Sequence, residues 1–304
     1  MNSKAMQGLR QVAVGGGGPE DVIFEPAGTI LTGLRDEGRL VRVDPVSQNF
    51  ETVAELGGMP LGLDWMPDGR LLVCNAKLGP QLVDVASGAV EALAVKGETI
   101  HLANNAHVLG DGTVFISCSS AAYPLEEYQK DIIEDTASGR LLRIDPDGSA
   151  HVLKDGLSFA NGVVVLEDQG LALVAETSKR VIHAVPLGGG ASRIWAETPG
   201  HPDNMVLSAT GEVYVALPSL PSAVLEKLHN GPLLLRQIAA RLPEFMQPQP
   251  ELCCRMAVFG RDGALKSVLD GDTDVYSFVT SMRAGPGIMA MGSIEHDFIG
   301  VFDL

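Results

Sequence analysis

Apolar and polar residues alternate over short stretches along most of the chain, which is the period of half-buried β-strands. Six times, such a run is followed by a polar turn that contains glycine and then by a second β-rich run. In the second repeat, residues 60–65 precede the turn at Asp68-Gly69, and residues 71–73 form the second run. Each of these pairs predicts a β-hairpin.

A second pair of short strands follows most of the hairpins. Residues 39–45 (Arg-Leu-Val-Arg-Val-Asp-Pro) and 140–146 (Arg-Leu-Leu-Arg-Ile-Asp-Pro) are near copies, and each leads into another turn and strand. The hairpins begin at residues 19, 60, 103, 160, 202 and 278, and three of these intervals match the propeller period of roughly 40–50 residues. Four strands in each of six units predict an all-β fold, a six-bladed β-propeller with four antiparallel strands per blade.

The two longer intervals contain insertions, at about residues 119–138 and 217–252. In the second insertion, apolar residues recur at helical spacing between residues 222 and 243, which predicts a short helical lid in blade five. Both insertions follow inner hairpins, so we expect them to lie over the mouth of the central channel. No other region has a convincing helical pattern, which excludes the eight helices of an α/β barrel.

The two ends of the chain are expected to meet in one blade. The last repeat ends with residues 298–304 as its third strand and has no fourth. Residues 9–15 resemble the fourth strands of other repeats, such as residues 265–271. We therefore predict that the N-terminal strand closes the last blade, which removes an open sheet edge, and that residues 1–304 form one domain.

The composition of the chain limits the binding partners and the cellular compartment that we expect. The chain has 38 acidic and 22 basic side chains and a net charge of −16, which argues against nucleic acid or an anionic membrane as a partner. No apolar run has the length of a membrane span or a signal peptide, so we expect no membrane span and a cytoplasmic protein. The cysteines show no C-x-x-C pattern, so we expect reduced, buried thiols, with a bridge at Cys253 or Cys254 as the alternative.

Equivalent positions on the inner strands of a propeller form a ring around the channel. The position eight residues before the turn glycine, or nine in the fourth repeat, selects Glu20, Leu61, Asn104, Asn161, Asp203 and Val279. Four of these six residues carry a side-chain oxygen. Such a set favours one divalent cation, and calcium fits best because its flexible coordination tolerates ligands from four blades, while magnesium, manganese, zinc and iron(II) remain alternatives.

Several motifs at these positions resemble a known superfamily. They are Gly18-Pro19-Glu20-Asp21, Ala103-Asn104-Asn105, Phe159-Ala160-Asn161-Gly162-Val163, Val174-Ala175-Glu176-Thr177 and Pro202-Asp203-Asn204. They resemble the calcium-dependent propellers that include gluconolactonase/senescence-marker-protein-30 lactonases, paraoxonases and strictosidine-synthase-like proteins, and are most similar to the last branch. The resemblance implies that Glu20, Asn104, Asn161 and Asp203 bind the metal, with Asn204 as the additional ligand of paraoxonase-like members.

Two positions depart from relatives within that superfamily. Strictosidine synthase uses a catalytic glutamate on its last inner strand, whereas residues 276–282 of this chain contain no carboxylate. Paraoxonase-like enzymes have a histidine on the second inner strand, where this chain has Leu61. The resemblance therefore does not extend to alkaloid condensation or to a histidine mechanism at that position.

The resemblance implies a metal-dependent hydrolase, a lactonase or esterase, that acts on a small molecule. Asp203 is the expected general base, and His101, His107 and His201 are alternative bases or hydrogen-bond donors to substrate because they lie beside the ligand motifs. Two other functions stay open at this point: a non-catalytic, calcium-stabilised interaction scaffold, and a lyase or an enzyme that forms C–C or C–N bonds. A homo-oligomer through the helical insertion is also an expectation.

Overall fold

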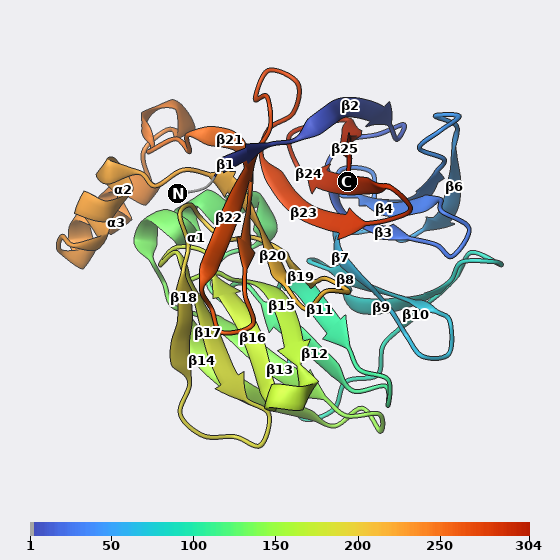
Figure 1. Cartoon of the computed structure of the whole chain (residues 1–304). Coiled ribbons are helices and arrows are strands. Elements are labelled where there is room, and N and C mark those ends of the chain that lie inside the picture. Colours follow the sequence, from blue (N-terminus) through green and yellow to red (C-terminus); the bar gives the residue numbers. More distant parts are fainter. Residues whose placement is uncertain (1–2) are drawn as a thin grey trace.

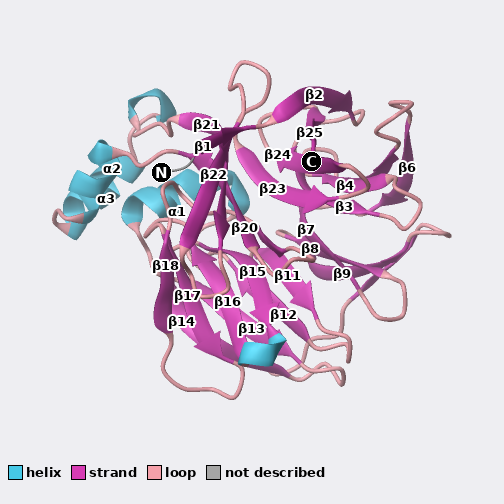
Figure 2. Cartoon of the chain, in the orientation of Figure 1, coloured by secondary structure: helices cyan, strands magenta, loops and turns pink. Residues whose placement is uncertain are grey.

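The computed structural model describes residues 3–304, and in these residues the strands form six sheets arranged as the blades of a propeller (Figure 1). Five sheets have four strands and one has five. Apart from one N-terminal strand, neighbouring strands are antiparallel. The predicted six-bladed propeller is confirmed, and Figure 2 shows that helices are confined to a few short segments.

In blades one to five, the four strands follow one another in the chain from the inner to the outer edge. Blade one contains β3 (Pro19–Phe24), β4 (Ile30–Leu34), β5 (Arg39–Val43) and β6 (Phe50–Glu55). Blade two contains β7 (Pro60–Trp65), β8 (Leu71–Asn75), β9 (Gly79–Asp84) and β10 (Ala89–Ala92). Blade three contains β11 (Ala103–Val108), β12 (Val114–Cys118), β13 (Gly139–Ile144) and β14 (Ala150–Leu157).

Blades four to six repeat this order with one change at the closure. Blade four contains β15 (Ala160–Leu166), β16 (Leu171–Glu176), β17 (Val181–Pro186) and β18 (Arg193–Glu197). Blade five contains β19 (Met205–Leu207), β20 (Val213–Ser219), β21 (Leu252–Phe259) and β22 (Leu265–Asp270). Blade six contains β23 (Val279–Ala284), β24 (Ile288–Ser293), β25 (Phe298–Asp303) and, from the other end of the chain, β2 (Gln7–Ala13).

The N-terminal segment joins two blades. β2 pairs antiparallel with β25, so the predicted closure of the last blade is confirmed. β1 (Ser3–Ala5) pairs in parallel with β22 and adds a fifth strand to blade five, which the repeat pattern did not predict. The segment therefore covers the outer edges of both blades, which leaves fewer unpaired edge groups.

Apolar side chains between neighbouring blades form the core. Leu31 and Leu40 of blade one, for example, pack with Leu63 and Leu71 of blade two, and all four are fully buried. Hydrogen bonds link the inner strands across the same boundaries. The carboxylate of Asp21 accepts the N–H of Leu63 at 2.8 Å, and that of Asp64 accepts the N–H of Val108 at 2.8 Å. These contacts fix each inner strand against the next.

The two insertions pack together as a cap. The first contains α1 (Tyr128–Glu134), and the second, residues 220–251, contains α2 (Ala223–His229) and α3 (Leu233–Ala240). Ile133 of α1 packs with Leu225 of α2 and with Ala239 and Ala240 of α3. The predicted helical insertion in blade five is confirmed, whereas the helix in the first insertion was missed because α1 has only seven residues and no sustained apolar period. Short 3₁₀ turns occur at Leu125–Glu127, Glu167–Gln169 and Glu244–Met246.

The outer side of the cap is apolar. Leu233, Leu234, Leu235 and Ile238 are each more than half exposed. None of the helices described in residues 3–304 has the length and apolar character needed to cross a membrane. Oligomerisation through this surface stays a prediction. The four cysteines are free and buried, as expected, and no disulfide forms at Cys253 or Cys254.

Candidate functional site

The first residues of four inner strands are irregularly paired, and these irregularities turn the side chains of the predicted ring toward the pocket. In β3, β7, β11 and β15 the pairing register skips between the first and fourth residues of the strand. Such bulges redirect side chains locally and are frequent beside functional sites. The redirected second residues include Glu20, Asn104 and Asn161, which line one pocket. Asp203 precedes the short strand β19 and lines the same pocket.

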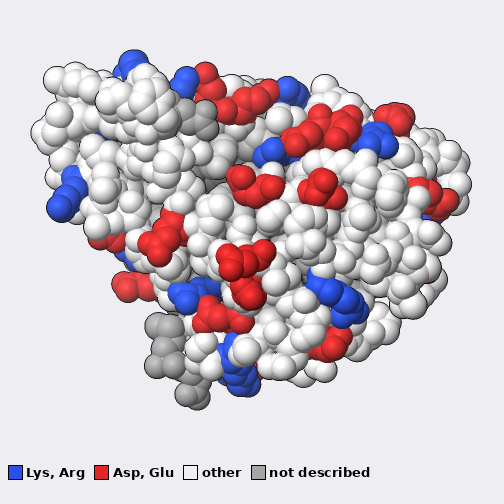
Figure 3. Space-filling view, turned by 90° about the horizontal axis from the view of Figure 1, so that it is seen from above, with Lys and Arg blue, Asp and Glu red and all other residues white. Residues whose placement is uncertain are grey.

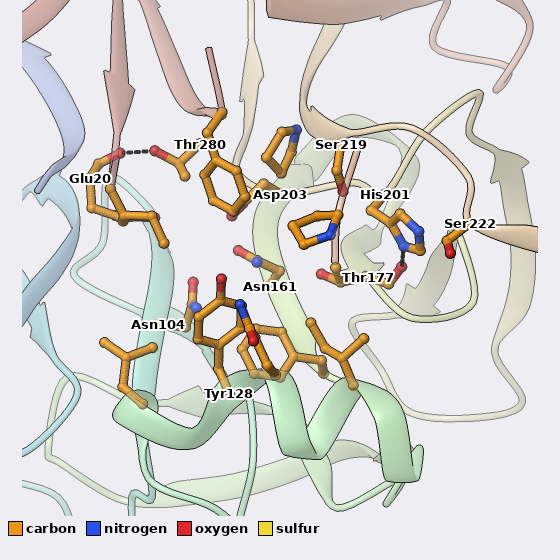
Figure 4. A pocket seen from close by; sticks show the side chains of 18 of the residues that line it. Glu20, Asn104, Tyr128, Asn161, Thr177, His201, Asp203, Ser219, Ser222 and Thr280 are labelled. Atoms are coloured by element: carbon orange, nitrogen blue, oxygen red, sulfur yellow. Dashed lines mark hydrogen bonds between the residues drawn. The ribbon is translucent and has the colours of Figure 1, made fainter. Parts of the chain in front are cut away.

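The sixth ring position differs from the predicted one. Val279 is buried in the apolar core between blades five and six, and Thr280 lines the pocket instead. The cause is the length of the hairpin. Gly285 N–H bonds to Ile288 O, whereas in blade one Glu25 N–H bonds to Thr29 O, so the sixth hairpin is one residue shorter and the count from its glycine is displaced by one. The Thr280 hydroxyl donates to the backbone oxygen of Glu20 at 2.6 Å (Figure 4).

Four of the five predicted metal ligands line one end of the pocket, which we call its floor, and the fifth lies directly behind it. Glu20, Asn104, Asn161 and Asp203 line it, as Figure 4 shows. Asn204 lies behind Glu20, and its Nδ2 donates to Glu20 Oε1 at 2.9 Å. The arrangement agrees with the expected convergence of blades one, three, four and five.

Each of these five residues has a buried side-chain oxygen without a hydrogen-bond partner: Glu20 Oε2, Asn104 Oδ1, Asn161 Oδ1, Asp203 Oδ1 and Asn204 Oδ1. Buried polar atoms are normally paired, because leaving one unsatisfied is costly. A divalent cation accepts ligation from several such oxygens at once, and carboxylate and amide oxygens are what calcium prefers. The donor set therefore fits a hard cation. No cluster of three or more His, Cys, Asp or Glu side chains suited to a metal occurs in the described part of the chain, so the fit depends on the amides.

The electrostatics of the floor favour the same interpretation. Burial raises the pKa of Glu20 well above its usual range, and the neighbouring carboxylate of Asp203 raises it further. Burial also raises the pKa of Asp203 to about 8. Two buried carboxyl groups that oppose each other's ionisation are stabilised as anions by a nearby cation.

The predicted histidines lie in three different environments. His201 is buried and lines the pocket, and its Nδ1 lies 3.0 Å from the carbonyl oxygen of Thr177. Because that carbonyl can only accept, Nδ1 carries the proton, and burial lowers the pKa of His201. His101 is exposed, is not part of the pocket lining, and precedes the left-handed turn at Leu102. His107 is on β11, three residues beyond Asn104, and burial lowers its pKa, but it does not line the pocket.

Several pocket residues were not predicted. Tyr128 reaches the pocket from α1, Arg35 from the loop after β4, and Phe159 and Phe278 from the positions before two inner strands. Phe159 belongs to a motif that the sequence singled out for Asn161, so its position was a usable signal. Tyr128 gave no such signal, because the packing of the cap against the channel depends on contacts between two distant insertions.

Charge is unevenly distributed over the molecule. Figure 3 shows acidic side chains over the middle of the face seen from above, whereas the left end, where α2 and α3 lie, is mostly uncharged. Residues 220–251 contain equal numbers of acidic and basic residues, although the chain as a whole has a net charge of −16. The acidic excess is therefore carried by the propeller and the first insertion, and not by the second insertion.

Comparisons with known proteins identify relatives of this chain. A family model described as Strictosidine synthase-like, N-terminal, matches residues 2–43. Strictosidine synthase-like protein 10 of Arabidopsis thaliana is 28% identical over 95% of this chain and 86% of its own length. Adipocyte plasma membrane-associated protein of Mus musculus is 27% identical over 98% of this chain and 78% of its own length.

Solved structures share the fold. A gluconolactonase from Xanthomonas campestris has a TM-score of 0.70 and 15% identity, over 99% of this chain and 91% of that one. The calcium-binding protein regucalcin from Agrobacterium tumefaciens has a TM-score of 0.69 and 15% identity, over 99% of this chain and 95% of that one. A family model described as SMP-30/Gluconolactonase/LRE-like region matches residues 24–231, more than half of the sequence. The chain therefore belongs to the SMP-30/gluconolactonase/LRE-like family.

Proposed function

We propose that this protein is a divalent-cation-dependent hydrolase that opens a lactone or ester, with calcium as the cation. The observation that carries the proposal is the group of five unpartnered, buried oxygens at the floor of a pocket. Four of these residues line the pocket directly, so a substrate that enters it would meet the cation. The gluconolactonase of the same fold supports the choice of reaction class.

The side chains of the floor have distinct tasks in this proposal. The bound cation would polarise the substrate carbonyl and stabilise the negative charge that develops on its oxygen. Asp203 holds the attacking water and accepts its proton as the water oxygen bonds to the carbonyl carbon. It returns this proton to the alkoxide that leaves when the acyl C–O bond breaks. Glu20 is held in place by Asn204, through the 2.9 Å hydrogen bond to Oε1, and its unpartnered Oε2 would bind the cation.

His201 is assigned a secondary role as an acceptor for a substrate or product hydroxyl. Its Nδ1–H donates a hydrogen bond to the carbonyl oxygen of Thr177, so Nε2 of the neutral ring is an acceptor. In Figure 4 the His201 ring lies beside Thr177 and Ser222, on the other side of the pocket from Glu20. Asp203 is therefore the preferred base, because it belongs to the floor itself.

The test is hydrolysis of a panel of lactones and aryl esters by purified protein, with calcium and with a chelator. We expect turnover with calcium, its loss in chelator and its return when calcium is restored. Asp203→Asn is expected to lower kcat by about 10²–10⁴-fold, the usual contribution of a general base.

A matched control is Glu176→Gln. Glu176 is also a buried acid beside the channel, but its oxygens bond to Ser158 N–H and to His183, and it does not line the pocket. This variant should keep wild-type turnover. Hydrolysis that continues at full rate in chelator, or in folded Asp203→Asn protein, contradicts the proposal.

A further inference from the structure

The walls of the pocket contrast with its floor. Above the oxygen donors, α1 contributes Tyr128, Ile132 and Ile133, and the second insertion contributes Leu220, Leu225 and Pro250. Among the described residues that line the pocket, Arg35 is the one Lys or Arg side chain, and the acidic side chains are Glu20 and Asp203 of the floor. Uncharged polar side chains also line the pocket above the floor: Gln129, Thr177, His201, Ser219, Ser222 and Gln249. Apolar side chains outnumber them there, so a ligand that extends from the floor is surrounded mainly by hydrocarbon.

Two aromatic side chains reach this wall from strained backbone positions. Phe159 and Phe278 have φ values of 64° and 55°, a left-handed conformation that is rarely adopted by bulky residues. Each stands two positions before a ring residue, where blade one has Gly18 with a φ of 66°. A glycine would adopt this conformation without strain. The fold therefore holds two phenyl rings against the pocket where a smaller residue would be easier to accommodate.

The wall is poorly suited to a substrate with many hydroxyl groups. Each hydroxyl that enters an enclosed site needs a hydrogen-bond partner, and burial without one is costly. Burial of hydrocarbon groups in the same space is favourable, by an amount roughly proportional to their buried area. Tyr128 and Phe159 lie with their ring centroids 6.2 Å apart, so an aromatic pair joins the cap to the start of blade four in this wall.

We propose that the substrates of this site are apolar lactones or esters, in which an alkyl or aryl group lies between Phe159, Phe278 and helix α1, and not polyhydroxylated sugar lactones. The inference rests on the proposed hydrolase function, because it assigns the substrate class of the same pocket. The carbonyl stays at the floor beside Asp203, and the apolar group points toward the cap.

The test uses lactones that share one ring. A series of δ-lactones with a straight alkyl chain of one to seven carbons beside the ring oxygen is compared with glucono-δ-lactone. We expect kcat/KM to rise about threefold for each added methylene until the chain fills the pocket. The best member should exceed glucono-δ-lactone by about 100-fold. Equal or better turnover of glucono-δ-lactone overturns the proposal and leaves the hydrolase function intact.

A binding measurement separates the substrate class from the reaction. The corresponding alkyl δ-lactams resist hydrolysis, and their affinity can be measured by calorimetry on the calcium-loaded protein. Affinity that rises with chain length supports the apolar pocket even if no lactone is turned over, which would contradict the hydrolase function alone. Affinity that is independent of chain length contradicts the apolar pocket.

Phe159→Gly and Leu102→Gly form a matched pair of variants. Both residues have left-handed backbones, with φ values of 64° and 48°, and their carbonyls accept Thr177 N–H and Ser119 N–H, respectively, at 3.1 Å. Only Phe159 lines the pocket. We expect Phe159→Gly to reduce the preference for the longest over the shortest chain by about tenfold, and Leu102→Gly to preserve it. Thermal unfolding checks that both proteins are folded, and an unchanged preference in folded Phe159→Gly contradicts the proposal.

Discussion

The floor and the roof of the pocket are built in different ways. The floor consists of side chains at the starts of inner strands, held by bulges and by hydrogen bonds that cross from blade to blade. The roof comes from two insertions that pack through a small apolar cluster around Ile133 and Leu225. The repeated scaffold therefore positions the polar side chains of the floor, while the two insertions supply much of the apolar wall above it.

The two regions also differ in what limits their stability. The floor contains buried, unpartnered oxygens and two carboxyl groups whose pKa values are raised. The roof also has buried carboxylate oxygens without a hydrogen-bond partner, on Asp131, Glu134 and Asp135. Basic side chains lie beside two of these acids, however: Asp135 pairs with Lys179 and Arg236, and Glu134 pairs with Arg241. The stability of the floor should therefore depend on a bound cation, and the stability of the roof on the packing of its apolar side chains.

The largest effect should come from removing the cation. At a calcium concentration of about 1,000 times Kd, binding to the folded state adds about 4 kcal/mol to the free energy of unfolding. For a protein of this size we expect chelation to lower Tm by roughly 6 °C. Differential scanning calorimetry with calcium and with chelator measures the shift.

Two variants sharpen that prediction. Asp203→Asn should reduce the calcium-dependent shift in Tm by more than half, because it removes one of the two carboxylates of the floor. Asp168→Asn changes a largely exposed acid that pairs with Arg261 and does not line the pocket, and should keep the full shift. Equal shifts in both variants would mean that calcium acts elsewhere on this acidic surface.

The second-largest effect should come from adding a side chain where two inner strands lie close together. A Cβ at Gly162 would lie 2.5 Å from the backbone oxygen of Asp203 and 2.6 Å from the backbone nitrogen of Met205. We expect Gly162→Ala to cost about 3 kcal/mol in the free energy of unfolding, the upper range for overpacking. A Cβ at Gly110 would meet no atom within 4 Å, so Gly110→Ala is the control and should be neutral or slightly stabilising. Urea unfolding of both variants measures the difference.

The contrast between floor and roof explains which parts of the site could be predicted from the sequence. The floor residues can be predicted because the hairpins repeat: Glu20, Asn104, Asn161 and Asp203 occupy equivalent places in hairpins one, three, four and five. Counting from the turn glycine fails where a hairpin changes length, and it selected Val279 in place of Thr280. The roof has no repeated sequence. Its packing depends on contacts between residues about a hundred positions apart, such as Ile133 and Leu225. A local sequence pattern therefore predicts neither the helix of the first insertion nor the place of Tyr128 in the pocket.

A smaller, local effect is expected in the roof. Ile133 is 2% exposed and packs with Leu225, Ala239 and Ala240. Ile133→Ala should destabilise the cap by about 2 kcal/mol or more, while Tm of the propeller changes little because the blades have separate apolar clusters. Hydrogen exchange should then quicken in residues 220–251 and not in the inner strands. Val224→Ala, at a residue that is 58% exposed, is the control and should leave exchange unchanged.

The smallest effect concerns a buried acid outside the pocket. Burial raises the pKa of Glu176, but the hydrogen bonds from His183 and from Ser158 N–H outweigh it, so the pKa is below its usual range. A lowered folded-state pKa stabilises the protein above the unfolded value of about 4.3 and is lost as the pH falls through the folded value. Glu176→Gln should therefore cost roughly 1 kcal/mol at pH 7, and the difference from wild type should shrink as the pH falls below about 4. Urea unfolding between pH 3 and pH 7 measures it, and a difference that grows toward low pH would assign the stabilisation to another group.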